Sequence, residues 1–248
     1  MTGRGDPLES GEFFWKGDVS FADVAFKPAD AVKPVRGITG AAAFKGDRME
    51  TSGFQANIGK SVMKGKCRMR SFREAKVACQ FNTPFLEAAD LGLHGSDRDV
   101  IFRDIKAQFT AGPDLLHVER LSLRLGKSFF IFSGDWPDFA EPKITVNLNS
   151  PYIHSDDAFR LMALKPSKRD DHSPSATDLD LRLQVDAGVF NGFDFRKLNA
   201  GMKYSQRILN IETLEADILG GSLKGKGIVE IRSDGQNHYK ATFALDQA

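Results

Sequence analysis

The chain contains three copies of one sequence unit. A shift of 67 residues, made without gaps, brings a series of identical residues into register. These are Arg36, Ile38, Asp47, Gly59, Lys60, Ser61, Glu74, Lys76, Asn82, Pro84 and Asp90, which fall on Arg103, Ile105, Asp114, Gly126, Lys127, Ser128, Glu141, Lys143, Asn149, Pro151 and Asp157. A second shift, of 160 residues, places Ala56 and Ile58 on Ala216 and Ile218. Tandem units of this kind predict a stack of repeated elements rather than a compact enzyme built around one pocket.

Within each copy, apolar and polar residues alternate with a period of two, which predicts strands with one apolar and one solvated face. The clearest run is Leu179 to Val189, and similar runs begin at Trp15, Ala75, Leu121, Ile144 and Tyr239. Turn signals at Lys45-Gly46-Asp47, Ala111-Gly112-Pro113-Asp114 and Ser205-Gln206-Arg207 occupy the same place in the three copies and predict hairpin loops. Each copy is therefore expected to form a meander.

Two irregularities interrupt this pattern. The apolar positions step by three at Thr51–Phe54 and at Ile211–Leu214, and we expect a β-bulge at each. The meanders of the first two copies end in Asn82–Asp90 and Asn149–Asp157, where Thr83 or Ser150 is expected to cap a short helix that begins with the following proline.

These elements predict a mainly β fold: an elongated, twisted antiparallel sheet of repeated meander units, shaped as a β-groove or half-barrel, with short connecting helices. We expect residues 1–10 to be a disordered start, 11–164 to form two meander repeats and 165–177 to be a flexible loop. Residues 178–248 form the third repeat, and the whole is expected to be one continuous domain.

Composition restricts the classes of partner. The chain has 34 basic and 33 acidic residues, so its net charge of +1 provides no global attraction to nucleic acid. Its 20 Phe against 3 Tyr and 2 Trp favour an apolar lining. No stretch is long and apolar enough to cross a bilayer, and the first residues lack the apolar core of a secretory signal.

The third copy suggests a family. The segments Phe195–Met202 and Leu209–Gly227, with Val35–Gly40 and the Asn-Ser/Thr-Pro-aromatic joints upstream, resemble the C-terminal region of AsmA-like proteins of Gram-negative bacteria. The resemblance covers nearly the whole chain from about Gly11, and it rests on a diffuse pattern of alternation, glycines and turns without a reactive residue.

The resemblance implies a segment of a longer envelope protein, anchored by a membrane helix outside this sequence and located in the periplasm. The family is similar to bridge-like lipid-transfer proteins built from repeating β-grooves, and it is linked to outer-membrane biogenesis and phospholipid transport between membranes. We therefore expect a non-catalytic lipid-binding or lipid-conducting segment that binds phospholipid or another acyl lipid. The alternative is a structural or protein-interaction β-module of the envelope whose apolar core is sealed.

The expected lipid-binding surface is the apolar face of the strands. Its candidate residues in the first copy are Ile38, Ala42, Phe44, Met49, Phe54, Ala56 and Ile58. Those in the third copy are Leu198, Ala200, Met202, Leu209, Ile211, Leu214, Ala216 and Ile218. In a closed barrel or sandwich these side chains would be core, whereas a sheet that grows by stacking units has no evident second sheet to cover them.

Two further features allow two interpretations each. Lys64, Lys66, Arg68 and Arg70 alternate with small or apolar residues, so four cations share one face of a strand and are candidates for headgroup binding. We favour the alternative, an ordinary solvated outer face whose charges protect the strand edge against aggregation. Cys67 and Cys79 come opposite each other if their strands pair about Arg73, and either a disulfide or two buried thiols is compatible with the sequence.

Catalytic and metal-binding patterns are not evident, so we expect no enzyme activity and no cofactor. The five histidines are scattered, and Asp97, Asp99, Asp104, Asp156-Asp157 and Asp170-Asp171 are interpreted as solvated turns. The segment Gly220–Gly225 and its counterpart Gly59-Lys60-Ser61 resemble a phosphate-binding loop, but no helix-forming stretch follows. Their glycines are expected to permit a bulge or a close strand crossing.

Overall fold

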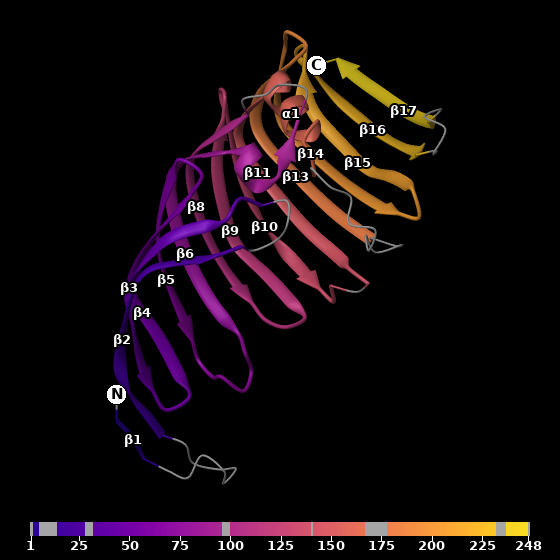
Figure 1. The fold of residues 1–248 in the computed structure, drawn as a ribbon. Coiled ribbons are helices and arrows are strands. Elements are labelled where there is room, and N and C mark those ends of the chain that lie inside the picture. Colours follow the sequence, from indigo (N-terminus) through magenta and orange to yellow (C-terminus); the bar gives the residue numbers. More distant parts are fainter. Residues whose placement is uncertain are drawn as a thin grey trace. The chain divides into compact units, whose positions relative to one another are not determined.

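The computed structural model describes residues 2–4, 14–27, 32–95, 100–139, 141–166, 178–231 and 237–247 (Figure 1). The chain divides into two compact units. Unit 1 contains residues 1–119 and 165–168, and unit 2 contains residues 120–164 and 169–248. The division falls within strand β9 (Leu115–Leu125), in the middle of the second sequence repeat.

Unit 1 is a meander of antiparallel strands. Its remaining elements are β1 (Thr2–Arg4), β2 (Phe14–Phe26), β3 (Val35–Lys45), β4 (Arg48–Ile58), β5 (Ser61–Met69), β6 (Val77–Glu87), the 3-10 helix η1 (Ala88–Leu91), β7 (Leu93–His94), β8 (Ile101–Ala111) and β12 (Lys165–Pro166). The hydrogen-bonded order is β1-β2-β3-β4-β5-β6-β8, and β7 pairs separately with β12. Strand order therefore follows chain order, as short hairpin connections require.

Unit 2 continues the same pattern with one exception. Its remaining elements are β10 (Ser128–Pro137), β11 (Lys143–His154), α1 (Ser155–Met162), β13 (Asp178–Phe190), β14 (Phe193–Ser205), β15 (Ile208–Ile218), β16 (Gly221–Glu230) and β17 (His238–Gln247). The order is β10-β11-β13-β14-β15-β16-β17. All pairs are antiparallel except β11–β13, which is parallel.

The parallel pair is the exception to the predicted antiparallel pairing among the described strands of unit 2. A hairpin cannot join parallel neighbours, which need a connection of a dozen or more residues to return the chain to its starting end. The connection from β11 to β13 includes helix α1, and β13 starts at the same end of the sheet as β11.

The strand bounds confirm the sequence repeat. The 67-residue shift carries β3, β4, β5 and β6 onto β8, β9, β10 and β11 to within one residue at each end. The 160-residue shift carries β4 onto β15 with identical bounds. The predicted mainly β fold of repeated meanders with short connecting helices is therefore confirmed, and Figure 1 shows the strands of each unit lying side by side in one twisted layer.

The predicted bulges are also confirmed. In β4–β5 the register moves from Glu50 opposite Arg68 to Phe54 opposite Gly65, which leaves one extra residue on β4. In β15–β16 it moves from Ile211 opposite Gly227 to Leu214 opposite Gly225, with one extra residue on β15. The extra residue keeps apolar side chains on one face despite the phase change in the sequence.

The helices begin later than the sequence suggested. Pro84 and Pro151 lie inside β6 and β11, and the Thr83 and Ser150 hydroxyls each donate to the carbonyl two residues ahead, at 2.9 Å. Helix α1 starts at Ser155, where His154 Nδ1 accepts a hydrogen bond from Asp156 N at 3.4 Å. The hydroxyls thus support strand backbone next to a proline that lacks an N–H.

Many of the buried large apolar side chains lie toward one end of each unit, the end that carries η1 or α1. In unit 1 they include Val35, Ile58, Leu86 and Phe102, each within two residues of a strand terminus at that end. In unit 2 they include Leu125, Phe130, Ile153 and Phe195, at the corresponding end. Each unit therefore has a packed core at one end, while the remainder of its sheet is a single layer.

Three expected segments fall wholly or partly outside the described residues. Of residues 1–10, Thr2–Arg4 form β1 and pair with Phe14–Lys16. Of residues 165–177, Lys165–Pro166 form β12 and the remaining residues are outside the described ranges. Asp97, Asp99 and Asp170-Asp171 are also outside them.

Candidate lipid-binding surface

The apolar face of the sheet carries the predicted lining residues, and most of them are half-buried. Side chains two positions apart along a strand share a face, so the alternation in β3, β4, β14 and β15 puts the apolar residues together. The half-buried members are Ile38, Phe44, Met49, Phe54, Leu198, Met202, Leu209, Ile211, Leu214 and Ile218. Half-burial means that neighbours on the same face cover these side chains laterally while part of each still meets solvent.

The other predicted lining residues are buried. Ala56 and Ile58 are 1% and 3% exposed and belong to the packed end of unit 1. Ala42, Ala200 and Ala216 are small side chains that lie between larger neighbours. A ligand on this face would therefore contact the large half-buried residues rather than these five.

No second sheet covers the apolar face within the described residues. Each described strand of a unit packs mainly against its hydrogen-bonded neighbours, and η1 and α1 contact the main layer at the packed end. The short β7–β12 pair contacts η1. Large apolar side chains in a single layer stay partly hydrated unless something fills the space above them.

Three cations of β5, and Arg70 directly after it, lie on the opposite face. Lys64, Lys66, Arg68 and Arg70 are exposed, and they alternate with half-buried residues of the apolar face. Arg68 is directly opposite Glu50 of β4 in the register. The predicted alternation is therefore confirmed, and these cations point away from the face that carries the lining residues.

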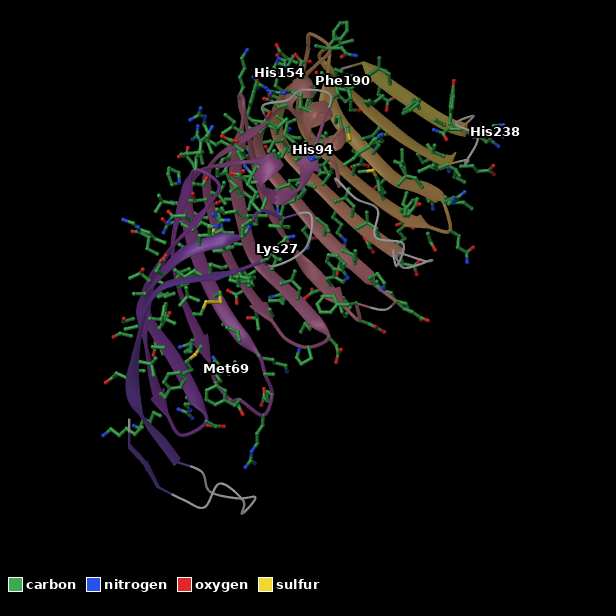
Figure 2. The ribbon with its side chains drawn as sticks, viewed as in Figure 1. Lys27, Met69, His94, His154, Phe190 and His238 are labelled. Carbon is green, nitrogen blue, oxygen red and sulfur yellow. A yellow bond between two sulfur atoms is a disulfide. The ribbon has the colours of Figure 1, made fainter. Side chains whose placement is uncertain are left out.

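The two cysteines form a disulfide, the first of the two alternatives left by the sequence. Cys67 of β5 and Cys79 of β6 are directly opposite in the register, with a Cα–Cα distance of 4.1 Å (Figure 2). Beside the bond, Cys67 N donates to Thr51 Oγ1 at 2.7 Å, and Thr51 is 8% exposed at the bulge of β4. The hydroxyl thus pairs an N–H that the bulge leaves without its ladder partner.

A buried carboxylate that recurs in the first two repeats was not predicted from the sequence. Asp157, at 6% exposure, sits in the first turn of α1, and its Oδ2 accepts from Lys127 N at 2.8 Å, Ser128 N at 3.1 Å and Ser128 Oγ at 2.9 Å. The interpretation of Asp157 as part of a solvated turn was therefore wrong. The carboxylate ties the helix to the β9–β10 hairpin.

The first repeat places Asp90 in the same position. Asp90 is 0% exposed and lies against the Gly59-Lys60 hairpin turn, and its Oδ1 is 2.6 Å from the Lys33 ammonium. The hydrogen bond to Asp90 and its charge raise the pKa of Lys33 above its usual value. The identical spacing from Gly59 to Asp90 and from Gly126 to Asp157 was the sequence signal that could have revealed the site.

Glycine is required in these two turns because the carboxylate occupies the space of a side chain. Gly59 and Gly126 have φ of +55° and +56°, and a Cβ built on either would overlap the facing aspartate. Leu219 holds the corresponding position in the third repeat at φ +55° and is 71% exposed. These segments are two-residue hairpin turns, which corrects the expectation of a bulge or strand crossing.

The polar face of unit 2 contains a hollow. A hollow of about 580 Å³ lies over β10, β11, β13, β14 and β15, with Gly201 among its lining residues and Asn147, Arg182 and Asn199 around it. The Lys203 ammonium at its rim is 2.8 Å from Glu212 Oε1, and this hydrogen bond and the Glu212 charge raise the pKa of Lys203. The mixed polar lining is unlike the surface that an acyl chain needs.

None of the described helices has the length and apolar character needed to cross a membrane. The described residues contain no group of three or more His, Cys, Asp or Glu side chains arranged to hold a metal ion.

Comparison of the chain with protein-family models, with curated proteins and with solved structures gives no match.

Proposed function

We propose that this chain is a non-catalytic lipid-binding or lipid-conducting segment of a periplasmic AsmA-like protein that takes part in outer-membrane biogenesis or phospholipid transport between membranes. Acyl chains lie against the apolar face of the sheet, and headgroups remain in water at its rim. The proposal combines the resemblance of the sequence with the single-layer architecture of the two units.

The observation that carries the proposal is the half-burial of large apolar side chains on one face of a single-layer sheet. Ten of the predicted lining residues are in this state, including Phe44, Met202 and Ile211. Among the described elements, η1 and α1 pack against the layer at the packed end, and the short β7–β12 pair contacts η1. A sealed structural module would instead place these residues in its core.

The energy of such binding is sufficient. Burial of a methylene group contributes about 0.8 kcal/mol, so a 16-carbon chain gains on the order of 10 kcal/mol before entropic costs. Part of this gain is offset by ordering the lipid. The remainder is enough to retain a phospholipid tail while permitting its movement along the face.

Native mass spectrometry of the chain purified from a Gram-negative host tests the proposal, together with titration of a fluorescent phospholipid. We expect co-purified phospholipid and saturable binding. Leu209→Glu places a charge on the apolar face and should abolish binding, whereas the matched Asn210→Glu on the polar face of the same strand should leave it unchanged.

The variants also separate the proposal from the sealed-core alternative. Because Leu209 is only half-buried, Leu209→Glu should lower the free energy of unfolding by about 1–2 kcal/mol and leave the chain folded. A wild-type chain that carries no lipid and gains no thermal stability from phospholipid would favour the structural or protein-interaction module.

A further inference from the structure

The loop between β5 and β6 of unit 1 carries an exposed aromatic ring. This β5–β6 loop follows Met69, labelled in Figure 2, and leads into β6 at Val77, at the end of the strands opposite η1. Its Phe72 is 45% exposed. Phe72 N donates to Asp47 O of the β3–β4 turn at 3.0 Å, so the backbone that presents the ring is tied to the neighbouring turn.

The exposed ring continues the apolar face of the sheet. Phe72 stacks on Phe44, with ring centroids 6.2 Å apart and an angle of 10° between the ring planes. Phe44 is half-buried on the apolar face of β3, directly opposite Met49 of β4. The apolar face of unit 1 therefore extends onto the loop, where part of it is presented to solvent. Exposed apolar groups of this kind, bordered by polar residues, mark interaction surfaces.

The exposed charged residues of the β5–β6 loop and the β3–β4 turn include five cations and two carboxylates. The cations are Lys45, Arg48, Arg70, Arg73 and Lys76, and the carboxylates are Asp47 and Glu74. This end of unit 1 is therefore positively charged around an apolar group. Cations are attracted to anionic lipid headgroups, and an aromatic ring beside them can enter the interfacial region of a bilayer.

The second repeat has the aromatic residue in its corresponding loop but not the excess of cations. The 67-residue shift carries residues 70–76 onto 137–143, between β10 and β11, and Phe72 onto Phe139. Phe139 is 44% exposed, and its ring lies 5.8 Å from that of Trp136. The exposed charged residues of this loop are the carboxylates Asp138 and Glu141 and the cation Lys143. The charge thus distinguishes the β5–β6 loop from its counterpart.

We propose that the β5–β6 loop and the β3–β4 turn form a docking site for the surface of an anionic lipid bilayer. Phe72 enters the headgroup region, and the surrounding Lys and Arg side chains contact lipid phosphates. A bilayer fits this surface better than a protein partner does, because the centre of a protein interface is an apolar, desolvated patch depleted of charged residues. A bilayer interface instead accepts a single ring while the charges around it stay hydrated.

The docking site is separate from the surface proposed to bind acyl chains, and the two proposals can fail independently. Docking depends on Phe72 and the cations of unit 1, whereas acyl-chain binding depends on the half-buried residues of the apolar face. The stacking of Phe72 on Phe44 would bring a docked bilayer next to that face. Only this last consequence, a route for lipid between the bilayer and the sheet, rests on the proposed function.

Co-sedimentation of the full chain with lipid vesicles tests the docking site. The wild type should bind vesicles of phosphatidylcholine with about 30% phosphatidylglycerol at least about tenfold more tightly than vesicles of phosphatidylcholine alone. Phe72→Ser and Arg73→Glu should each weaken this binding about tenfold, and the matched Phe139→Ser should change it less than about twofold. A wild type that does not bind, equal binding to the two kinds of vesicle, or equal weakening by Phe139→Ser would overturn the proposal.

Tryptophan fluorescence provides a second test that keeps an aromatic ring in the loop. Relative to the wild type, Phe72→Trp should gain emission that shifts to shorter wavelength on anionic vesicles and is quenched by brominated lipids, whereas Phe139→Trp should not. Leu209→Glu, which should abolish acyl-chain binding, should dock like the wild type. Unchanged melting temperatures are the control for folding of each variant. Emission of Phe72→Trp that is unaffected by vesicles to which the chain binds would refute the placement of Phe72 in the bilayer.

Discussion

The glycine of the β9–β10 turn gives a prediction whose magnitude follows from the structure. Gly126 has φ +56°, and a Cβ there would overlap the Asp157 carboxylate. In Gly126→Ala the left-handed backbone costs about 1–2 kcal/mol. Displacement of a buried carboxylate that accepts three hydrogen bonds costs about 1–3 kcal/mol more. We expect the free energy of unfolding to fall by about 3 kcal/mol.

The third repeat provides a matched control in which the substitution is expected to stabilise the fold rather than destabilise it. Leu219 has nearly the same φ, +55°, but its side chain is 71% exposed. Leu219→Gly relieves about 1–2 kcal/mol of backbone strain and adds about 0.5–1 kcal/mol of entropy to the unfolded chain. The variant should therefore be about 0.5 kcal/mol more stable than the wild type.

Urea unfolding followed by far-ultraviolet circular dichroism measures both variants, with the slope of the transition checked for each. A double variant, Gly126→Ala with Asp157→Ala, should lose less than the sum of the two single losses because both act on one contact. A decrease in the free energy of unfolding of less than about 0.5 kcal/mol for Gly126→Ala would refute the steric argument, because ordinary surface substitutions change stability by that amount.

Three other predictions follow from contacts in unit 1. Replacing Cys67 and Cys79 with serine removes a disulfide between residues 12 positions apart, and it should lower the free energy of unfolding measured in urea by about 3 kcal/mol. An unchanged midpoint of the urea transition would show that the disulfide does not stabilise the fold. Thr51→Val removes the acceptor of the Cys67 N–H and should cost about 1–3 kcal/mol, and Thr51→Ser should recover most of it. Because the pKa of Lys33 is raised, its ion pair with Asp90 stabilises the fold fully at pH values below the unfolded lysine pKa of about 10.4, and this stabilisation is lost as pH rises through the folded pKa. The free energy of unfolding of the wild type should therefore fall more steeply above about pH 10 than that of Lys33→Met. Equal slopes in the two proteins would contradict the contact.

Periodicity predicted the fold because the sheet is built locally. Most strands pair with the next strand in sequence, so alternation, turn signals and the 67-residue repeat were enough to give the strands, hairpins and bulges. The bulges at Thr51 and Ile211 could be predicted because the apolar positions change phase there. Without a bulge, this phase change would turn every later apolar side chain to the opposite face of the sheet.

The missed features depend on contacts that local patterns do not report. Asp157 has the sequence context of an exposed helix start, and only the approach of the β9–β10 hairpin buries it. The parallel β11–β13 pair depends on the path of the connection rather than on either strand. Whether Cys67 and Cys79 form a disulfide or remain two thiols depends on the pairing register of β5 and β6, which the alternation of residues does not determine by itself.

The most direct test of an open apolar face is the labelling rate of a cysteine placed on it. Ile211→Cys lies on the half-buried apolar side of β15, and Glu215→Cys on the exposed polar side of the same strand is the control. With the native disulfide intact, Ile211→Cys should react with a small maleimide under native conditions, faster than the chain unfolds. Phospholipid should slow this reaction and leave that of Glu215→Cys unchanged. Labelling of Ile211→Cys only at the rate of global unfolding, with no effect of phospholipid, would contradict the account.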